Sequence, residues 1–436
     1  MLKVTGIAAI AAIAWLAFVG YSAFAGLWMS PVVAEGDAGA FFEYAVQNLQ
    51  ENNRGAASLL IIEDGVIVNE FHDGPEGNTN RDTVFAAASM SKWPAAYAVM
   101  TLVADGRADL DAPVSQYLTR WRLPDGDFGN EGVTIRRLLS HTAGFTDYLG
   151  FGDYAADEIL PDLENELDNP RTSSGKPVNI RVNVEPGTEW RYSGGSYLLL
   201  ELLVEEISGQ TFEDYVREAV FEPLEMSRTG YGFIDSYANS AGSLRTDGAR
   251  MTGHQYASSA ATALVTSSAD LAKFVFAQIG NRAASAPLSP EGVKSMRAPH
   301  GQSAGFDIWG LGTILYAPAG NGDFIFGHDG TNEPAINAAA RLNPANDDAL
   351  ILLVSGHPAL ATNIGSDWVF WQTGYPDLFA TDAVFASMVV PGLAGTLAII
   401  ALAVVPVSYT HLTLPTKEDE GRGGGAGGGG GGGGGG

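Results

Sequence analysis

Two residues three positions apart, Ser89 and Lys92, have types and a spacing that suit acyl-transfer chemistry. They follow the small-residue run 86–88, and the composition of 89–104 predicts a helix that begins at Ser89. Residues i and i+3 share one helix face. A serine hydroxyl needs a base, and a lysine desolvated at a helix N-terminus can serve as one, while backbone N–H groups there can bind an oxyanion. The pair therefore indicates an activated serine nucleophile.

Two further short motifs carry residues of the same chemistry. Tyr192 precedes Ser193 and Gly194, and a tyrosine beside a cationic lysine can act as a general base. His328 and Gly330 follow an apolar strand; a cationic or donor side chain there, with a glycine that admits a substrate backbone, suits a peptide-like ligand beside the strand. Read alone, Tyr192 and His328 each fit an ordinary structural residue better than a functional one.

The elements that must position these motifs read as an α/β fold. Apolar segments 56–62 and 66–71 flank Asp64 and Gly65, a two-residue hairpin signal. Helical patterns and late strands follow in the order 89–104, 134–140, 197–207, 212–220, then 311–316, 323–326, 335–342 and 349–354. Strands at both ends with helices between them predict an antiparallel sheet flanked by helices, with a mostly helical lobe inserted into it.

Taken together and in this order, the motifs resemble the superfamily of serine β-lactamases and penicillin-binding proteins, nearest its class C-like branch with esterases and D-amino-acid peptidases. Five other segments share the resemblance: 106–114, 138–145, 185–188, 221–226 and 267–272. The resemblance covers about 40–356. It implies a β-lactamase/transpeptidase-like fold and an enzyme that works through an acyl-enzyme.

By the same resemblance, Ser89 is the acylated nucleophile, and Lys92 and Tyr192 share general-base and general-acid work. His328 and Gly330 line the third side of the cleft, and backbone N–H groups of Ser89 and Thr331 form the oxyanion hole. No cofactor and no metal is implied.

Two departures from the family pattern bear on the substrate. Gly194 stands where the family usually has asparagine, so a side-chain amide is missing, and His328 stands where lactamases usually have lysine. We therefore expect an esterase or D-peptidase type of activity rather than efficient β-lactam hydrolysis. Because histidine titrates near neutrality, we also expect activity to depend on pH through His328.

Competing nucleophile motifs have the wrong surroundings. A second S-x-x-K, Ser173 to Lys176, includes Gly175 and precedes Pro177, so no helix begins there cleanly. The segment 301–305 matches G-x-S-x-G, but it lacks the apolar strand before and the helix after that this motif needs. The seven histidines show no H-E-x-x-H pattern for zinc.

Composition removes other classes of function. The chain of 436 residues has no cysteine, which excludes disulfides and thiol chemistry. Its net charge of -26, with no basic stripe, argues against a nucleic-acid partner. A small-molecule or peptide substrate is the expected partner. No pattern indicates an oligomeric state.

Both ends of the chain point to a membrane. Residues 1–34 hold an apolar run after Lys3 and read either as a signal peptide or as an N-terminal anchor, and 383–406 read as a transmembrane helix. Residues 35–382 would then form an extracytoplasmic, periplasmic hydrolase domain. Residues 407–436 resemble read-through of a sequencing adaptor followed by poly-glycine, so we expect an artefact there. A membrane module that binds penicillin without turnover, as a sensor, is the alternative to a hydrolase.

Overall fold

The computed structural model describes residues 2–147, 153–172, 175–279 and 286–413. The chain divides into two compact units: the larger is Ala23–Ala386, and the smaller joins Met1–Ser22 with Ser387–Gly436.

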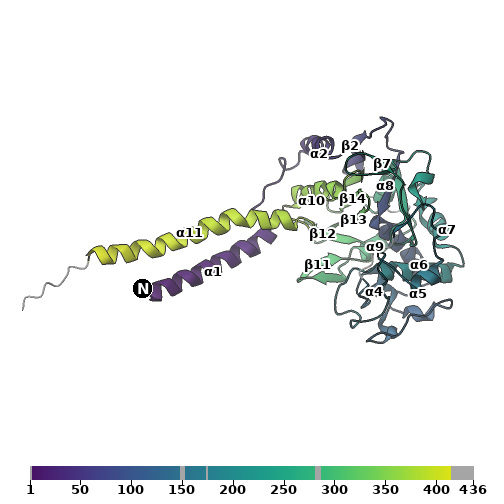
Figure 1. Cartoon of the computed structure of the whole chain (residues 1–436), viewed down its shortest axis with the longest axis horizontal. Coiled ribbons are helices and arrows are strands. Elements are labelled where there is room, and N and C mark those ends of the chain that lie inside the picture. Colours follow the sequence, from purple (N-terminus) through teal and green to yellow (C-terminus); the bar gives the residue numbers. More distant parts are fainter. Residues whose placement is uncertain (1, 148–152, 173–174, 280–285, 414–436) are drawn as a thin grey trace, which may run out of the picture. The chain divides into compact units, whose positions relative to one another are not determined.

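The larger unit contains an eight-stranded antiparallel sheet in the order β10-β11-β12-β13-β14-β15-β1-β2 (Figure 1). The first two strands and the last six pair although more than 200 residues separate them, as the predicted fold requires. The strands are β1 (Ala56–Glu63), β2 (Val66–Asp73), β10 (Gly301–Ser303), β11 (Phe306–Trp309), β12 (Ile314–Pro318), β13 (Phe324–Asn332), β14 (Ile336–Asn343) and β15 (Asp348–Ser355).

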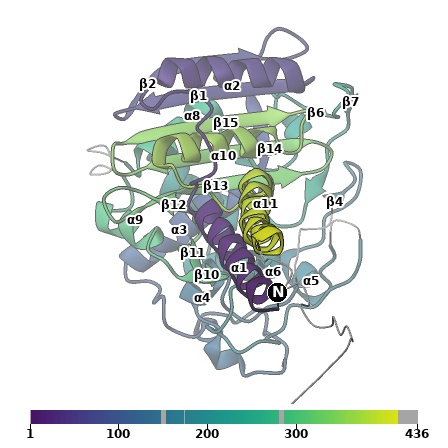
Figure 2. The same ribbon diagram turned by 90° about the vertical axis from the view of Figure 1, so that its left-hand side faces the viewer.

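Apolar layers cover both faces of this sheet. Alternate side chains of a strand point to opposite faces, so Leu60 and Ile62 of β1 enter one core while Leu59 and Ile61 enter the other. Helices α2 (Ala38–Asn52) and α10 (Leu360–Thr373) pack on one face (Figure 2). Helices α3 (Lys92–Ala104) and α8 (Ser268–Phe276) lie on the other.

The segment between β2 and β10 forms the inserted lobe, in which helices hold more residues than strands do and the connecting loops are long. A three-stranded sheet in the order β3-β9-β5 joins it to the main sheet. Besides α3 and α8, its helices are α4 (Ile135–Leu139), α5 (Leu163–Asp168), α6 (Gly194–Ser208), α7 (Phe212–Val216) with a π-helical turn (Arg217–Phe221), and α9 (Pro290–Met296). Its strands are β3 (Val84–Ala88), β4 (Asp153–Tyr154), β5 (Gly230–Tyr231), β6 (Ser243–Leu244), β7 (Arg250–Met251), β8 (Gln255–Tyr256) and β9 (Leu264–Ser267).

The structure corrects the predicted start of the helix at Ser89 and supports the rejection of the G-x-S-x-G segment as a nucleophile elbow. The helix does not begin as an α-helix at Ser89: a single 3-10 turn, Ser89–Ser91, precedes α3. The G-x-S-x-G segment forms the hairpin of β10 and β11, so its serine stands on a strand and not at a strand-to-helix elbow. Ser173 of the second S-x-x-K lies outside the described residues.

The smaller unit consists of most of α1 (Leu2–Phe24) and α11 (Thr381–Thr413). Both helices are long and apolar enough to cross a membrane, over Gly6–Phe24 and Thr381–Val404. The Trp15 indole N–H donates to the Pro391 carbonyl oxygen (3.0 Å), and a Cβ on Gly395 would overlap the Trp15 ring. The two helices therefore pack against each other through a glycine. Of the expected artefact, 407–413 continue α11 and 414–436 lie outside the described residues.

Candidate active site

Ser89 stands on a strained turn at the end of strand β3. Ala88 adopts φ 47° and ψ -131°, a conformation that L-residues rarely take and that is common at functional sites. The neighbouring Ser91 holds the turn, because its hydroxyl donates to the Ala88 carbonyl oxygen (2.6 Å) and accepts from the Leu264 N–H (2.9 Å). The turn thus leaves Ser89 partly exposed while Ser91 is buried.

Lys92 lies beneath Ser89 and is only 1% exposed. Its Nζ is 3.4 Å from the Ser89 Oγ and donates to the Ala261 carbonyl oxygen at 2.8 Å. None of the ion pairs among the described residues includes Lys92. The lysine is therefore aimed at the serine by a backbone carbonyl rather than held by a carboxylate.

A buried glutamate orders the loop that provides this carbonyl. Glu201 of helix α6 accepts hydrogen bonds from the Ser258 hydroxyl (2.8 Å) and the Ala260 N–H (3.0 Å). The Ser258 hydroxyl in turn accepts from the Ala261 N–H (3.2 Å). Burial raises the pKa of Glu201 to about 8, so the carboxyl is largely protonated at neutral pH.

Tyr192 immediately precedes helix α6, and the helix cap fixes its place. The Ser193 hydroxyl accepts from the Ser196 N–H (2.9 Å) and donates to the buried Asp147 carboxylate (2.6 Å). Lys92 Nζ lies 5.1 Å from the centre of the Tyr192 ring. Tyr192 and Lys92, distant in the sequence, therefore meet beside the serine, as the resemblance implied.

His141 supports Tyr192 from the other side. It takes a left-handed conformation (φ 58°), and its Nδ1 accepts a hydrogen bond from the Ser193 N–H (3.1 Å). Its ring packs on Tyr192 and Trp309, with ring centres 4.6 and 4.7 Å apart. Burial, with further contributions from Lys92 and His328, places its pKa well below the ordinary value. The Nδ1 acceptor role assigns the remaining proton to Nε2.

Strand β13 forms a further side of the site. Its partner β12 pairs with it only as far as Gly327, so the edge of His328–Asn332 is not paired with β12. A Cβ on Gly330 would overlap the Ala87 carbonyl oxygen and lie 3.0 Å from the Met90 nitrogen. Only glycine lets the strand approach the Ser89 turn this closely.

His328 differs from its expected state. Its Nδ1 donates to the Asp329 carbonyl oxygen (2.6 Å), because a carbonyl only accepts, and this leaves Nε2 as an unprotonated acceptor. Burial, with Lys92 nearby, lowers its pKa to about 3. The expectation of a cationic side chain that titrates near neutrality is therefore wrong: desolvation and a neighbouring cation both oppose protonation.

These groups surround a cavity of about 350 Å³, within the range of small-molecule sites. Five of the predicted site residues line it: Ser89, Tyr192, His328, Gly330 and Thr331. Lys92 lies below its floor, and Gly194 is buried at the start of α6 without lining the cavity.

Most of the remaining lining was not predicted from the sequence. It is apolar or small and consists of Trp190, Ile308, Trp309, Ile314, Pro358, Ala359, Thr362, Leu378 and Phe379, together with Asp329. Trp190 lies two positions before the predicted tyrosine, which was a usable signal. Leu378 and Phe379 carry no motif.

Comparisons with known proteins agree with this geometry. The family model described as Beta-lactamase matches residues 41–366. Penicillin-binding protein 4* of Bacillus subtilis (strain 168) is 28% identical over 192 residues, which are 42% of this chain and 39% of that protein. Protein flp of Staphylococcus aureus (strain N315) is 26% identical over 190 residues, 42% of this chain and 36% of that protein. The match thus spans less than half the length of either relative.

Solved structures show the same fold. The octameric penicillin-binding protein homologue from Pyrococcus abyssi aligns with a TM-score of 0.60 and 23% identity, over 78% of each chain. EstCE1, a hydrolase with promiscuous acyltransferase activity, aligns with a TM-score of 0.60 and 19% identity, over 77% of this chain and 98% of that chain. With a family match over most of its length and this fold, the chain belongs to the β-lactamase family, within the superfamily of serine β-lactamases and penicillin-binding proteins.

Proposed function

We propose that the chain is a membrane-anchored serine hydrolase that cleaves an ester or an amide through an acyl-enzyme on Ser89. The observation that carries the proposal is the 3.4 Å separation of Lys92 Nζ and Ser89 Oγ at the floor of the cavity. A serine and a candidate base within reach, in a concave site, are the parts that covalent acyl transfer requires.

The reaction proceeds in two halves. The Ser89 Oγ attacks the substrate carbonyl carbon and gives its proton to the Lys92–Tyr192 pair. The tetrahedral intermediate then expels the alcohol or amine, which receives that proton. Water next attacks the acyl-enzyme, gives a proton to the same pair, and releases the acid while Ser89 regains its proton.

Backbone N–H groups of Ser89 and Thr331 bind the oxyanion in this proposal. The free edge of β13 and its close packing at Gly330 against the Ser89 turn support this assignment. Donors held by a strand and a helix start need no reorganisation when the negative charge develops.

The site favours esters or peptide-like amides over efficient β-lactam hydrolysis. Gly194 offers no side-chain amide, and His328 presents a neutral ring where lactamases usually have a lysine. Both differences remove polar groups that a lactam carboxylate and amide would use.

The apolar helices support a membrane anchor, and Lys3 ahead of the first apolar stretch is the reason for placing the larger unit outside the cytoplasm. In the apolar stretches of Gly6–Phe24 and Thr381–Val404, only 17% and 6% of the residues are buried, as expected of helices that need another apolar environment. The contact of Trp15 with Pro391 supports retention of the first helix, because a cleaved signal peptide would leave α11 without this partner.

Ester turnover and penicillin labelling test the proposal and separate it from the alternative. The full chain in detergent is given p-nitrophenyl acetate and a fluorescent penicillin, with Ser89→Ala as the matched variant. Turnover that disappears in Ser89→Ala supports the hydrolase. Stable labelling at Ser89 without turnover identifies instead the non-turnover penicillin-binding module, which the missing amide at Gly194 favours. Turnover that survives in Ser89→Ala would overturn both.

A further inference from the structure

One wall of the cavity comes from a segment that follows the family-matched residues. The family match ends at 366, whereas Leu378 and Phe379, which line the cavity, lie between α10 and α11. Both are large apolar side chains and remain 37% and 41% exposed. Exposed apolar side chains gathered at the mouth of a site mark a surface that another apolar group covers.

A buried ion network holds this wall in place. The Asp377 carboxylate accepts from the Phe379 N–H (2.9 Å) and the Ala380 N–H (3.1 Å), and from the Ser366 hydroxyl of α10 (2.9 Å). The Arg341 guanidinium, 0% exposed, lies 3.4 Å from the same carboxylate. The wall is therefore a fixed part of the site.

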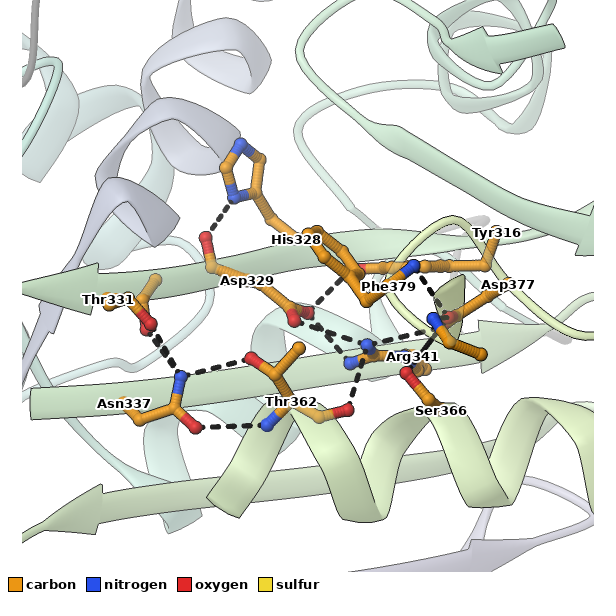
Figure 3. Close-up of polar contacts among 12 residues, drawn as sticks. Tyr316, His328, Asp329, Thr331, Asn337, Arg341, Thr362, Ser366, Asp377 and Phe379 are labelled. Atoms are coloured by element: carbon orange, nitrogen blue, oxygen red, sulfur yellow. Dashed lines mark hydrogen bonds and ion pairs between the residues drawn. The ribbon is translucent and has the colours of Figure 1, made fainter. Parts of the chain in front are cut away.

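The same arginine also binds strand β13. Its two Nη atoms donate to the Asp329 carboxylate at 2.7 and 3.1 Å, and the Tyr316 hydroxyl donates to Asp329 at 2.8 Å. Figure 3 shows Asp329 and Asp377 meeting at Arg341, with the His328 ring pointing away from them. Arg341 thus connects the wall to the strand that carries His328 and Gly330.

The charge of the lining favours an apolar substrate. Of the described residues that line the cavity, Asp329 alone is formally charged, and Arg341 and Tyr316 bind its carboxylate. The lining thus provides no cation for a carboxylate beside the scissile bond. Aromatic and aliphatic side chains provide most of the remaining contact surface.

We infer that the substrate carries an apolar alkyl or aryl group on one side of the scissile carbonyl, and that Leu378 and Phe379 bind this group. The inference rests on the proposed acyl-enzyme at Ser89. It makes the two residues determinants of specificity that the family domain does not provide.

The test is the dependence of kcat/KM on chain length. The full chain in detergent is given p-nitrophenyl acetate, butyrate and hexanoate, and in a second series acetate esters of alcohols of increasing length. The variants are Leu378→Ser, Phe379→Ser and Asp377→Asn, which keeps both side chains but weakens their support. Val66→Ser is the control, because Val66 is 57% exposed on β2, at the far edge of the sheet.

We expect wild-type kcat/KM to rise with chain length in one series. The ratio of kcat/KM for the longest ester to kcat/KM for the shortest should fall about tenfold in Leu378→Ser and in Phe379→Ser. The fall should be smaller in Asp377→Asn and absent in Val66→Ser. A fluorophosphonate probe on Ser89 checks that each variant retains its site.

Two results would overturn the inference in distinguishable ways. Esters hydrolysed without regard to chain length, or a ratio unchanged by the wall variants, would remove the inference and leave the Ser89 hydrolase standing. Neither turnover nor probe labelling in the wild type would remove the proposed function, and the inference with it.

Discussion

Gly330 passes the Ala87 carbonyl oxygen so closely that no Cβ fits between them. This contact joins β13 to the turn that carries the nucleophile. The distance between Ser89 and the strand edge therefore depends on the absence of a side chain at Gly330.

Substitution Gly330→Ala should reduce ester turnover far more than it reduces stability. The methyl group pushes β13 away from Ser89, at a cost of about 1–3 kcal/mol in unfolding free energy. Gly320→Ala is the matched control, because a Cβ there meets nothing within 4 Å. Turnover and urea unfolding are measured on both variants. Full turnover in Gly330→Ala would contradict the close packing.

The pH dependence of stability should show His328 neutral in the folded protein. Its folded pKa of about 3 is below the ordinary 6.5, so below about pH 6.5 the unfolded chain binds a proton that the folded chain does not. The contribution of neutral His328 to the free energy of unfolding is fully present above pH 6.5. It is lost as the pH falls towards 3, by about 1.4 kcal/mol per pH unit across that window. Urea unfolding between pH 7.5 and 4 should show a shallower loss in His328→Gln.

The dependence of activity on pH should also show that His328 is neutral in the folded protein. Between about pH 5 and 8, His328→Gln should have lower activity but a profile of the same shape as the wild type. An inflection near neutrality that only the wild type shows would mean that His328 is charged in the site.

Glu201 should make the folded protein less stable as the pH rises, whereas His328 should make it less stable as the pH falls. Burial raises its pKa to about 8 from 4.5, so between these values the unfolded chain loses a proton that the folded chain keeps. Its contribution is fully present below pH 4.5 and is lost as pH rises through 8. Glu201→Gln should therefore be less sensitive to pH between 6 and 9 than the wild type or Glu51→Gln, an exposed control on α2. If the free energy of unfolding changed equally with pH in all three proteins, the Glu201 carboxyl would be ionised in the folded protein.

The first apolar helix should remain in the mature protein. Trp15 contacts Pro391 and fills the space above Gly395, so α1 and α11 form a pair. Intact mass measurement of protein extracted from membranes should give a chain that includes α1. A chain that begins after Ala25 would show that the segment is a signal peptide.

Local chemistry made part of the fold predictable. Asp64 and Gly65 take φ of 50° and 71°, the conformation that their residue types favour, so the hairpin of β1 and β2 was predictable from these two residues and the apolar segments beside them. Strands β14 and β15 were predictable because they are long, mostly apolar runs. Strand β13 was predicted only over 323–326; it continues to Asn332, so His328 and Gly330 lie on the strand and not after it. Strand β3 was not, because its partner β9 lies about 180 residues away and both strands are short.

Some features of the site were likewise predictable from the sequence, whereas others depend on the tertiary structure. Ser89 and Lys92 were predictable as a pair because a nucleophile and its base need particular residue types at a helical spacing. Tyr192 was predictable only through the resemblance to the family. The charge of His328 was not, because burial and the approach of Lys92 are tertiary facts. The wall of Leu378 and Phe379 depends on Arg341, and a lone arginine in an apolar strand was a usable sign of a buried carboxylate partner.

The most direct test of the central claim is the mass of the covalent adduct. The full chain is treated with a fluorophosphonate probe, and peptides are mapped by mass spectrometry in the wild type and in Ser89→Ala. We predict one adduct, on the peptide that contains Ser89, and none in the variant. An adduct that persists in Ser89→Ala, or that maps to another serine such as Ser303, would contradict Ser89 as the nucleophile.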